Sequence, residues 1–207
     1  KRRRRRLKFN MNKRLIYLLF FLLLMQAGCS NAVRFTLSDD YGNQGPYTVA
    51  VLPVRAHAVL GSRENGIKAL FRGYAAQRLN AMGFSPIAFN DDDAKYAGAS
   101  PKEAAAMLGA DAALYIRLTD WEESSFVTYA GLEMSAVFEL YGKDGSILWQ
   151  ASYSTKESDI TLEKAPLELA LIKAYEPRIE RFVDAVFSTL PRPQRPGAKD
   201  GYFQWLP

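Results

Sequence analysis

The sequence has very little cysteine and histidine. One cysteine, Cys29, and one histidine, His57, occur in 207 residues. A single cysteine excludes a disulfide within the chain and every CxxC redox or metal motif. A single histidine excludes a multi-histidine metal site, so we expect His57 to be an ordinary loop residue. The motifs GxGxxG, GxSxG, HExxH and the P-loop are also missing, which argues against the common enzyme classes.

Positive charge is in excess only at the start of the chain. The formal net charge is +5, but residues 1–28 hold nine Lys and Arg and no acid. The residues after 28 hold 18 basic and 22 acidic side chains, a net charge of −4. A nucleic-acid-binding domain needs a basic surface. We therefore expect no nucleic-acid partner.

Residues 11–28 have the anatomy of a secretory signal peptide. Two basic residues, Lys13 and Arg14, precede an apolar run from Leu15 to Met25. A helix of eleven residues is roughly 16 Å long, about half the hydrocarbon core of a bilayer, so it is too short for a comfortable span. Small residues follow, as they do before a cleavage site. We interpret residues 1–10, which precede Met11, as an over-extended start without function.

The sequence Ala27-Gly28-Cys29 after this run resembles the lipobox of bacterial lipoproteins, although Gln26 stands where leucine is commoner. The resemblance implies that the Cys29 sulfur receives diacylglycerol and that the new amino terminus is acylated. Two or three acyl chains hold a protein on a membrane far more firmly than one. Ser30, in place of aspartate, implies an outer-membrane address. We expect a lipid-anchored protein on the periplasmic face of the outer membrane.

Three regions are expected after the leader. Residues 29–46 are polar and aperiodic, and we interpret them as a lipidated tether with a reach of at most roughly 56 Å. Residues 47–190 carry the hydrophobic patterns of one folded domain. Residues 191–207 form a Pro-rich C-terminal tail without periodicity.

The patterns within residues 47–190 predict the order β-α-β-α-β-β-β-α. Two β-α-β units imply parallel strands, and a final hairpin extends them antiparallel. We therefore predict a single α/β (α+β) domain with a mixed sheet and helices packed on it. The expected strands are Thr48–Val54, Phe84–Phe89, Ala112–Thr119 and a hairpin about Gly142–Gly145 with Phe138 facing inward; the expected helices run from Ile67 to Gly83, from Ser100 to Leu108, and from Pro166 through Pro177 to Leu190.

Three segments resemble a known family: Val49–Val54, Leu108–Ile116 and Asp144–Trp149. In this order behind a lipobox they resemble the outer-membrane lipoprotein family of the genome-derived Neisseria antigen type, whose function is unknown. The domain also resembles the N-terminal domain of the Tol β-propeller protein and the periplasmic domain of the curli secretion channel. The resemblance implies a non-catalytic accessory or protein-binding component of an envelope transport or secretion assembly. A curli-channel-like lipoprotein is one partner that the resemblance implies, and a homo-oligomer of this chain is the other arrangement that the sequence leaves open. A lipoprotein regulator of cell-wall synthases is the alternative, because some activators share this fold type.

Three acids, Asp120, Glu122 and Glu123, invite a third hypothesis, a periplasmic hydrolase with a glycosidase-like carboxylate pair. Such pairs need a fixed separation across a sugar cleft, so a charged loop is the simpler reading. The run Asp91–Asp93 lacks the alternation of a calcium loop and is read as a solvated turn. We expect no metal and no cofactor beyond the covalent lipid on Cys29.

Exposed aromatic residues are the better binding candidates. Trp121, Phe126 and Tyr129 follow the third expected strand, where they could contact a protein partner. A second cluster ends the tail and either folds back or serves a partner; it contains Tyr202, Phe203, Trp205 and Leu206.

We predict that Cys29→Ala abolishes lipidation, because the acyl chains are attached to the sulfur of this residue. Labelling cells with a fatty-acid analogue should mark the natural chain and leave the variant unlabelled as unprocessed precursor. Full labelling of the variant would exclude the lipoprotein interpretation.

Overall fold

A computed structural model describes residues 32–58, 60–88, 98–123, 131–158 and 169–193. The chain divides into two compact units, Lys1–Asn31 and Ala32–Pro207, and all of the described residues belong to the second. Cys29, Asp91–Asp93 and the two aromatic candidates Phe126 and Tyr129 lie outside the described residues, as do all the tail aromatics. None of the described helices is both long and apolar enough to cross a membrane.

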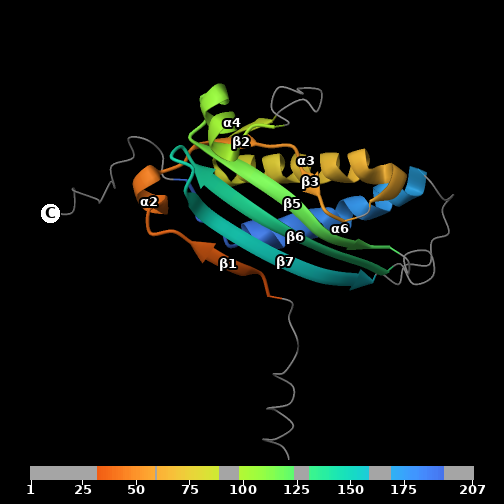
Figure 1. The fold of residues 1–207 in the computed structure, drawn as a ribbon. Helices are drawn as coiled ribbons and strands as arrows, with labels where there is room; N and C mark the ends of the chain where they lie inside the picture. Colours follow the sequence, from red (N-terminus) through yellow and green to blue (C-terminus); the bar gives the residue numbers. More distant parts are fainter. Residues whose placement is uncertain (1–31, 59, 89–97, 124–130, 159–168, 194–207) are drawn as a thin grey trace, which may run out of the picture. The chain divides into compact units, whose positions relative to one another are not determined.

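The described strands form one mixed sheet in the order β1-β7-β6-β5-β2-β4, and a short strand β3 pairs with β5 (Figure 1). β2 is parallel to both β4 and β5, whereas β5, β6 and β7 form an antiparallel meander. This confirms the predicted fold class, with parallel strands extended by an antiparallel hairpin. The strands are β1 Arg34–Leu37, β2 Thr48–Val51, β3 Arg55–Ala56, β4 Ser85–Ala88, β5 Ala112–Glu122, β6 Gly131–Gly142 and β7 Ile147–Ser158.

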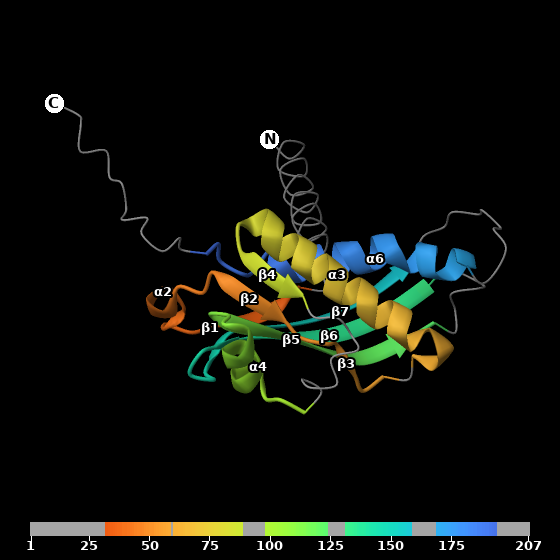
Figure 2. The ribbon, with the colours of Figure 1, turned by 90° about the horizontal axis from the view of Figure 1, so that it is seen from above.

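Two long helices, α3 (Glu64–Met82) and α6 (Leu169–Phe187), cover one face of the sheet, which we call the inner face (Figure 2). Alternate residues of the strands point to this face and are buried there, as the period of two requires. α6 continues through Pro177 without being divided. The buried strand residues of the inner face include Val49, Val51, Leu114, Ile116, Leu118, Leu132, Met134, Ala136, Phe138, Leu140 and Trp149.

The opposite, outer face is covered only in part, by helix α4 (Pro101–Leu108; Figure 2). Ala104 and Ala105 of α4 pack on Ala50 and Ala113, which alternate with the inner-face residues of β2 and β5. A capping box starts this helix: the Glu103 backbone N–H donates to Ser100 Oγ at 3.3 Å, and the Ser100 N–H donates to the Glu103 carboxylate at 2.8 Å. The rest of the outer face lies on the meander.

Residues 29–46 were predicted to be a tether, and the structure corrects this for the described part. β1 pairs antiparallel with β7, with Phe35 opposite Ala151 and Leu37 opposite Trp149. A helical turn, α2 (Tyr41–Gln44), follows; Tyr41 is buried and its hydroxyl donates to the Pro191 carbonyl at 2.8 Å. β1 forms because Val33, Phe35 and Leu37 alternate with polar residues, a pattern typical of a strand that is too short here to stand out in the sequence.

Smaller differences concern segment ends. The loop expected between residues 55 and 65 contains β3 and a 3-10 turn, η1 (Gly61–Arg63), before α3 begins at Glu64. At the start of β7, Ile147 is 41% exposed while Leu148 is fully buried. The pairing of β6 with β7 shifts register between Leu140 and Tyr141, which breaks the alternation at this point.

We predict that Phe138→Ala lowers the free energy of unfolding by about 3–5 kcal/mol. The Phe138 side chain is fully buried, 6.4 Å from the Phe182 ring and 5.8 Å from the Phe187 ring between centroids. Val137→Ala is the matched control, because Val137 is next in the same strand and half-buried on the outer face; it should cost about 1 kcal/mol or less. Urea unfolding of both variants measures this, and equal losses would contradict the assignment of faces.

Candidate functional site

Two of the three acids proposed as a catalytic set, Asp120 and Glu122, lie in strand β5 and not in a loop. β5 continues through Glu122 by pairing with β6, with Trp121 opposite Met134. The register shifts between Leu118 and Asp120, so an irregularity carries the strand past its expected end at Thr119. Asp120 and Glu122 are exposed, whereas Glu123 directly follows the strand and is half-buried.

Trp121 was predicted to be an exposed contact for a partner, and the structure corrects this. Its side chain is 6% exposed and belongs to the inner core. The ring packs edge-on against Tyr175 of α6, with centroids 5.3 Å apart and an interplanar angle of 85°. The indole N–H donates to Glu123 Oε2 at 3.2 Å. The register shift places Trp121 on the inner face.

Glu123 is the centre of a polar cluster that joins η1, the end of β5 and α6. Arg63 forms an ion pair with Oε1, and the Tyr175 hydroxyl donates to Oε2 at 2.6 Å beside the Trp121 indole. The Arg63 guanidinium also lies 5.8 Å from the centre of the Tyr175 ring. Both carboxylate oxygens are therefore engaged by donors from the protein itself. The cluster ties three elements together, and this argues against Glu123 as a nucleophile or general acid.

A second polar cluster lies on the outer face of the meander. Glu139 of β6 is only 7% exposed, although it points away from α3 and α6. Gln150 Nε2 donates to its carboxylate at 2.8 Å, and the Tyr141 hydroxyl donates at 3.0 Å. The Arg117 guanidinium approaches the carboxylate to 3.9 Å. Burial and the hydrogen bond to Glu139 raise the pKa of Tyr141 to about 12, so this hydroxyl is a fixed neutral donor.

Further polar pairs extend this outer-face surface along the meander. The Ser135 and Ser154 hydroxyls lie 2.9 Å apart across β6 and β7. Where β3 lies beside β5, the Arg55 guanidinium is 5.3 Å from the centre of the Tyr115 ring. These contacts hold long side chains in place at a solvent-facing sheet, which reduces the entropy lost when another molecule binds there.

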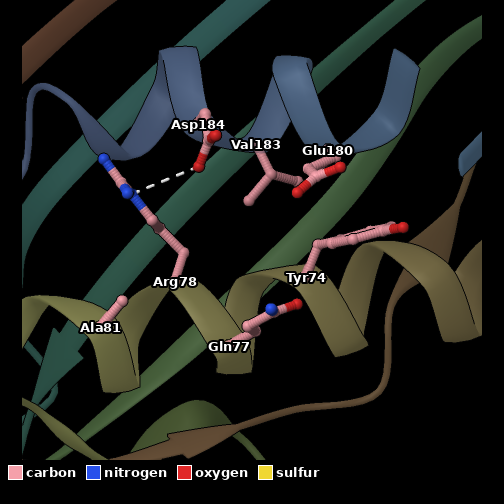
Figure 3. A pocket seen from close by; sticks show the side chains of 7 residues that line it. All are labelled: Tyr74, Gln77, Arg78, Ala81, Glu180, Val183 and Asp184. Atoms are coloured by element: carbon pink, nitrogen blue, oxygen red, sulfur yellow. Dashed lines mark ion pairs between the residues drawn. The ribbon is translucent and has the colours of Figure 1, made fainter. Parts of the chain in front are cut away.

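A small pocket of about 130 Å³ lies on the other side of the domain, between α3 and α6 (Figure 3). Tyr74, Gln77 and Arg78 of α3 face Glu180 and Asp184 of α6 across it, with Ala81 and Val183 completing its lining. Arg78 Nε lies 3.3 Å from Asp184 Oδ1 and bridges the pocket. Small-molecule sites are usually roughly 300–1,000 Å³. This pocket is therefore a helix–helix groove closed by an ion pair.

Within the described ranges, no group of three His, Cys, Asp or Glu side chains could hold a metal ion. His57 is exposed in the short segment after β3. The residues that sequence reasoning missed are Arg63, Tyr175, Glu139 and the exposed pair Phe35 and Leu37. Only the last pair left a signal, the alternation in residues 33–38.

No protein-family model matches the chain, and no curated protein matches it significantly. Solved structures do align with most of it. The PelC dodecamer from Paraburkholderia phytofirmans is 16% identical, with 75% of this chain and 96% of that chain covered and a TM-score of 0.48. Lipoprotein GNA1162 from Neisseria meningitidis is 18% identical, and the alignment covers 67% of this chain and 99% of that chain with a TM-score of 0.46. The LpoB C-terminal domain from Salmonella enterica is 15% identical, and the alignment covers 65% of this chain and 90% of that chain with a TM-score of 0.38. These alignments assign no function to the chain.

We predict that Tyr175→Phe lowers the free energy of unfolding at neutral pH by about 1.5–3 kcal/mol, because it removes a hydrogen bond to a charged group. Burial first, and then the bond to Glu123, raise the pKa of Tyr175. Because the pKa of Tyr175 is higher in the folded state, its neutral hydroxyl stabilises the fold fully at pH values below the unfolded-state pKa of about 10. This stabilisation is lost as the pH rises above that value.

The stability gap between the natural chain and Tyr175→Phe should therefore narrow above pH about 10, by up to about 1.4 kcal/mol per pH unit. Urea unfolding between pH 8 and pH 11, roughly the range around the tyrosine pKa, tests this. Trp121→Phe is the control, since it removes the other donor to Glu123 Oε2 but no titrating group. A gap that stays constant for Tyr175→Phe would contradict the assigned role of this hydroxyl.

Proposed function

We propose that this chain is the precursor of an outer-membrane lipoprotein, anchored at the periplasmic face through Cys29. Its domain would act as a non-catalytic, protein-binding accessory component of a cell-envelope transport or secretion assembly. The observation that carries the proposal is the sequence Ala27-Gly28-Cys29 behind a short apolar run, followed almost at once by a folded domain. Such a chain is built to be held at a membrane.

A binding role fits the described residues better than the hydrolase hypothesis. A glycosidase needs one carboxyl group that is free to protonate the leaving oxygen and a second one across a cleft. Glu123 instead accepts from Trp121 and Tyr175 and pairs with Arg63. Asp120 accepts the Trp121 backbone N–H at 2.9 Å on the exposed side of the strand. These contacts are those of a structural cluster.

The outer face of the meander is the surface that we assign to the partner. It is polar and ordered, and α4 packs mainly over β2 and the start of β5. A polar sheet face with fixed side chains suits contact with a folded protein, whose interface carries about one hydrogen bond per 100–200 Å². The aromatic residues Phe126, Tyr129, Tyr202, Phe203 and Trp205 stay predicted contacts outside the described residues.

The alternative, regulation of a cell-wall synthase, uses the same anchor and the same surface. The two hypotheses differ only in the identity of the partner. A curli-channel-like lipoprotein recovered with the chain would support the transport role, and a synthase would support the regulatory one. A second copy of the chain as the sole partner would point to a homo-oligomer.

We predict that Ser154→Arg disrupts partner recovery. Ser154 is exposed on the outer face of β7, so an arginine there adds bulk and charge at the proposed contact. Asn80→Arg is the matched control, since Asn80 is exposed on α3 across the sheet. After cross-linking in cells and purification from membranes, the first variant should lose its partner about tenfold, as a penalty of about 1.4 kcal/mol would produce. The second should recover it in full.

Full recovery with both Ser154→Arg and Asn80→Arg would move the contact away from the outer face. Loss of recovery with both variants would show that either substitution disturbs the fold, which thermal unfolding of each purified variant decides. Release of sugars from peptidoglycan by the purified chain would overturn the non-catalytic role itself.

A further inference from the structure

β1 exposes an apolar pair that the fold does not cover. Phe35 is 53% exposed and Leu37 is 44% exposed, and among the described residues only two other large hydrophobic side chains, Met107 and Ile147, are comparably exposed. Both members of the pair oppose buried residues of β7, Ala151 and Trp149. Residues directly opposite in an antiparallel pair share a face. The pair therefore continues the apolar inner face beyond the edge of the core.

The backbone of β1 is also open on one side, because β1 is the edge strand of the sheet. The Ser38 N–H donates to the Leu148 carbonyl at 2.9 Å. Hydrogen-bonded residues alternate along an antiparallel pair. Arg34 and Thr36 therefore share the pattern of Ser38, and the N–H and C=O groups of Phe35 and Leu37 point to the free edge. This edge offers apolar side chains together with polar backbone groups, which suits a half-wet environment.

The covalent chain limits how far this edge can lie from the predicted acyl chains. Arg34, the first residue of β1, follows Cys29 by five residues. Five residues reach at most about 18 Å when fully extended. Headgroup and interfacial regions together with the hydrocarbon core are roughly 40–45 Å thick, so this reach is comparable to the depth of one leaflet. If Cys29 carries acyl chains, β1 therefore begins within this distance of them.

We propose that β1 is a lipid-contacting strand, in which Phe35 and Leu37 lie in the boundary between the headgroups and the acyl chains of the membrane. This inference rests on the proposed lipid anchor at Cys29. Arg34 is exposed at the end of the strand nearest the anchor, where it meets lipid phosphates. Asp39 and Asp40 follow the strand and mark the end of the contact.

The contact is shallow. Unpaired backbone N–H and C=O groups cannot enter the hydrocarbon core, because no water is available there to bond them. The free edge of β1 therefore stops at the interfacial layer, where water and headgroups supply partners. Only the two apolar side chains reach toward the acyl chains, as in peripheral proteins that bury an apolar face in the headgroup region.

The test uses the full lipidated protein in vesicles of phosphatidylethanolamine and phosphatidylglycerol. Acylation occupies Cys29, so Phe35→Cys or Leu37→Cys provides a single thiol for an environment-sensitive fluorophore. Met107→Cys is the matched control, because Met107 is 52% exposed but lies on α4. We expect the labels at 35 and 37 to emit at shorter wavelength and to be quenched several-fold by a nitroxide near the lipid headgroup. The label at 107 should behave as in water.

Each other result overturns the proposal. Water-like emission at 35 and 37 shows that the strand stands away from the membrane. Shorter-wavelength emission without quenching shows that protein, and not lipid, covers the label. The cover is a second copy of the chain if the shift is lost when the protein is diluted among more vesicles, and it is this chain's own tail if the shift persists. Stronger quenching by a nitroxide deep in the acyl chains contradicts the shallow contact. Fatty-acid labelling of the same samples separates the two proposals: labelled protein with water-like emission defeats this one alone, and unlabelled Cys29 defeats the anchor as well.

Discussion

The fold depends on a layer of aromatic rings between the meander and the two long helices. The Phe138 ring packs edge-on against Phe187, and the Phe187 ring lies 5.8 Å from Trp149 between centroids. Phe182 contacts Phe71 of α3 and Tyr153 of β7, at 5.7 Å and 4.8 Å. Aromatic pairs of this geometry add about 0.5–1.5 kcal/mol each to the burial of their area. Because the rings come from α3, β6, β7 and α6, the layer fixes where both helices lie and which face of the meander is closed.

When helices close one face of an antiparallel sheet, polar residues occupy the other face. Here the side chains of that outer face are arranged around the Glu139 carboxylate. Glu139 lies between the inward residues Phe138 and Leu140, so it cannot turn into the core without breaking the alternation. A carboxylate with so little exposure needs partners, and Gln150, Tyr141 and Arg117 supply them. The same register that builds the core therefore also builds the surface that we assign to a protein partner. A shift of register along β6 would therefore exchange the two surfaces.

Sequence reasoning succeeded where the determining interactions are local. The hairpin follows from alternation about Gly142–Gly145, and the start of α4 follows from the Ser100–Glu103 box, which involves residues three apart. It failed where the determining interaction is remote. β1 is four residues long and its partner Ser152 lies more than a hundred residues later, so its weak alternation was indistinguishable from a polar tether. Trp121 was misplaced because an irregularity in β5 prolongs the strand, and nothing in the local sequence announces it. The Glu123 cluster joins residues 60 and 52 positions away in sequence, which no short motif records.

The position of β1 decides how the rest of the domain is presented. The sheet order runs from β1 through the meander to β2 and β4, so β4 is the opposite edge. Neighbouring strands are about 4.8 Å apart, and the five steps from β1 to β4 span roughly 24 Å. If β1 is held at the lipid surface as proposed, the remaining strands succeed one another away from it. Side chains stand roughly perpendicular to a sheet, so the sheet leans with its inner face toward the lipid to let Phe35 and Leu37 reach it. The outer face of β5, β6 and β7 then faces away from the lipid. The proposed anchor, with its short connection, would therefore orient the domain as well as retain it, and the Glu139 surface would be turned away from the lipid.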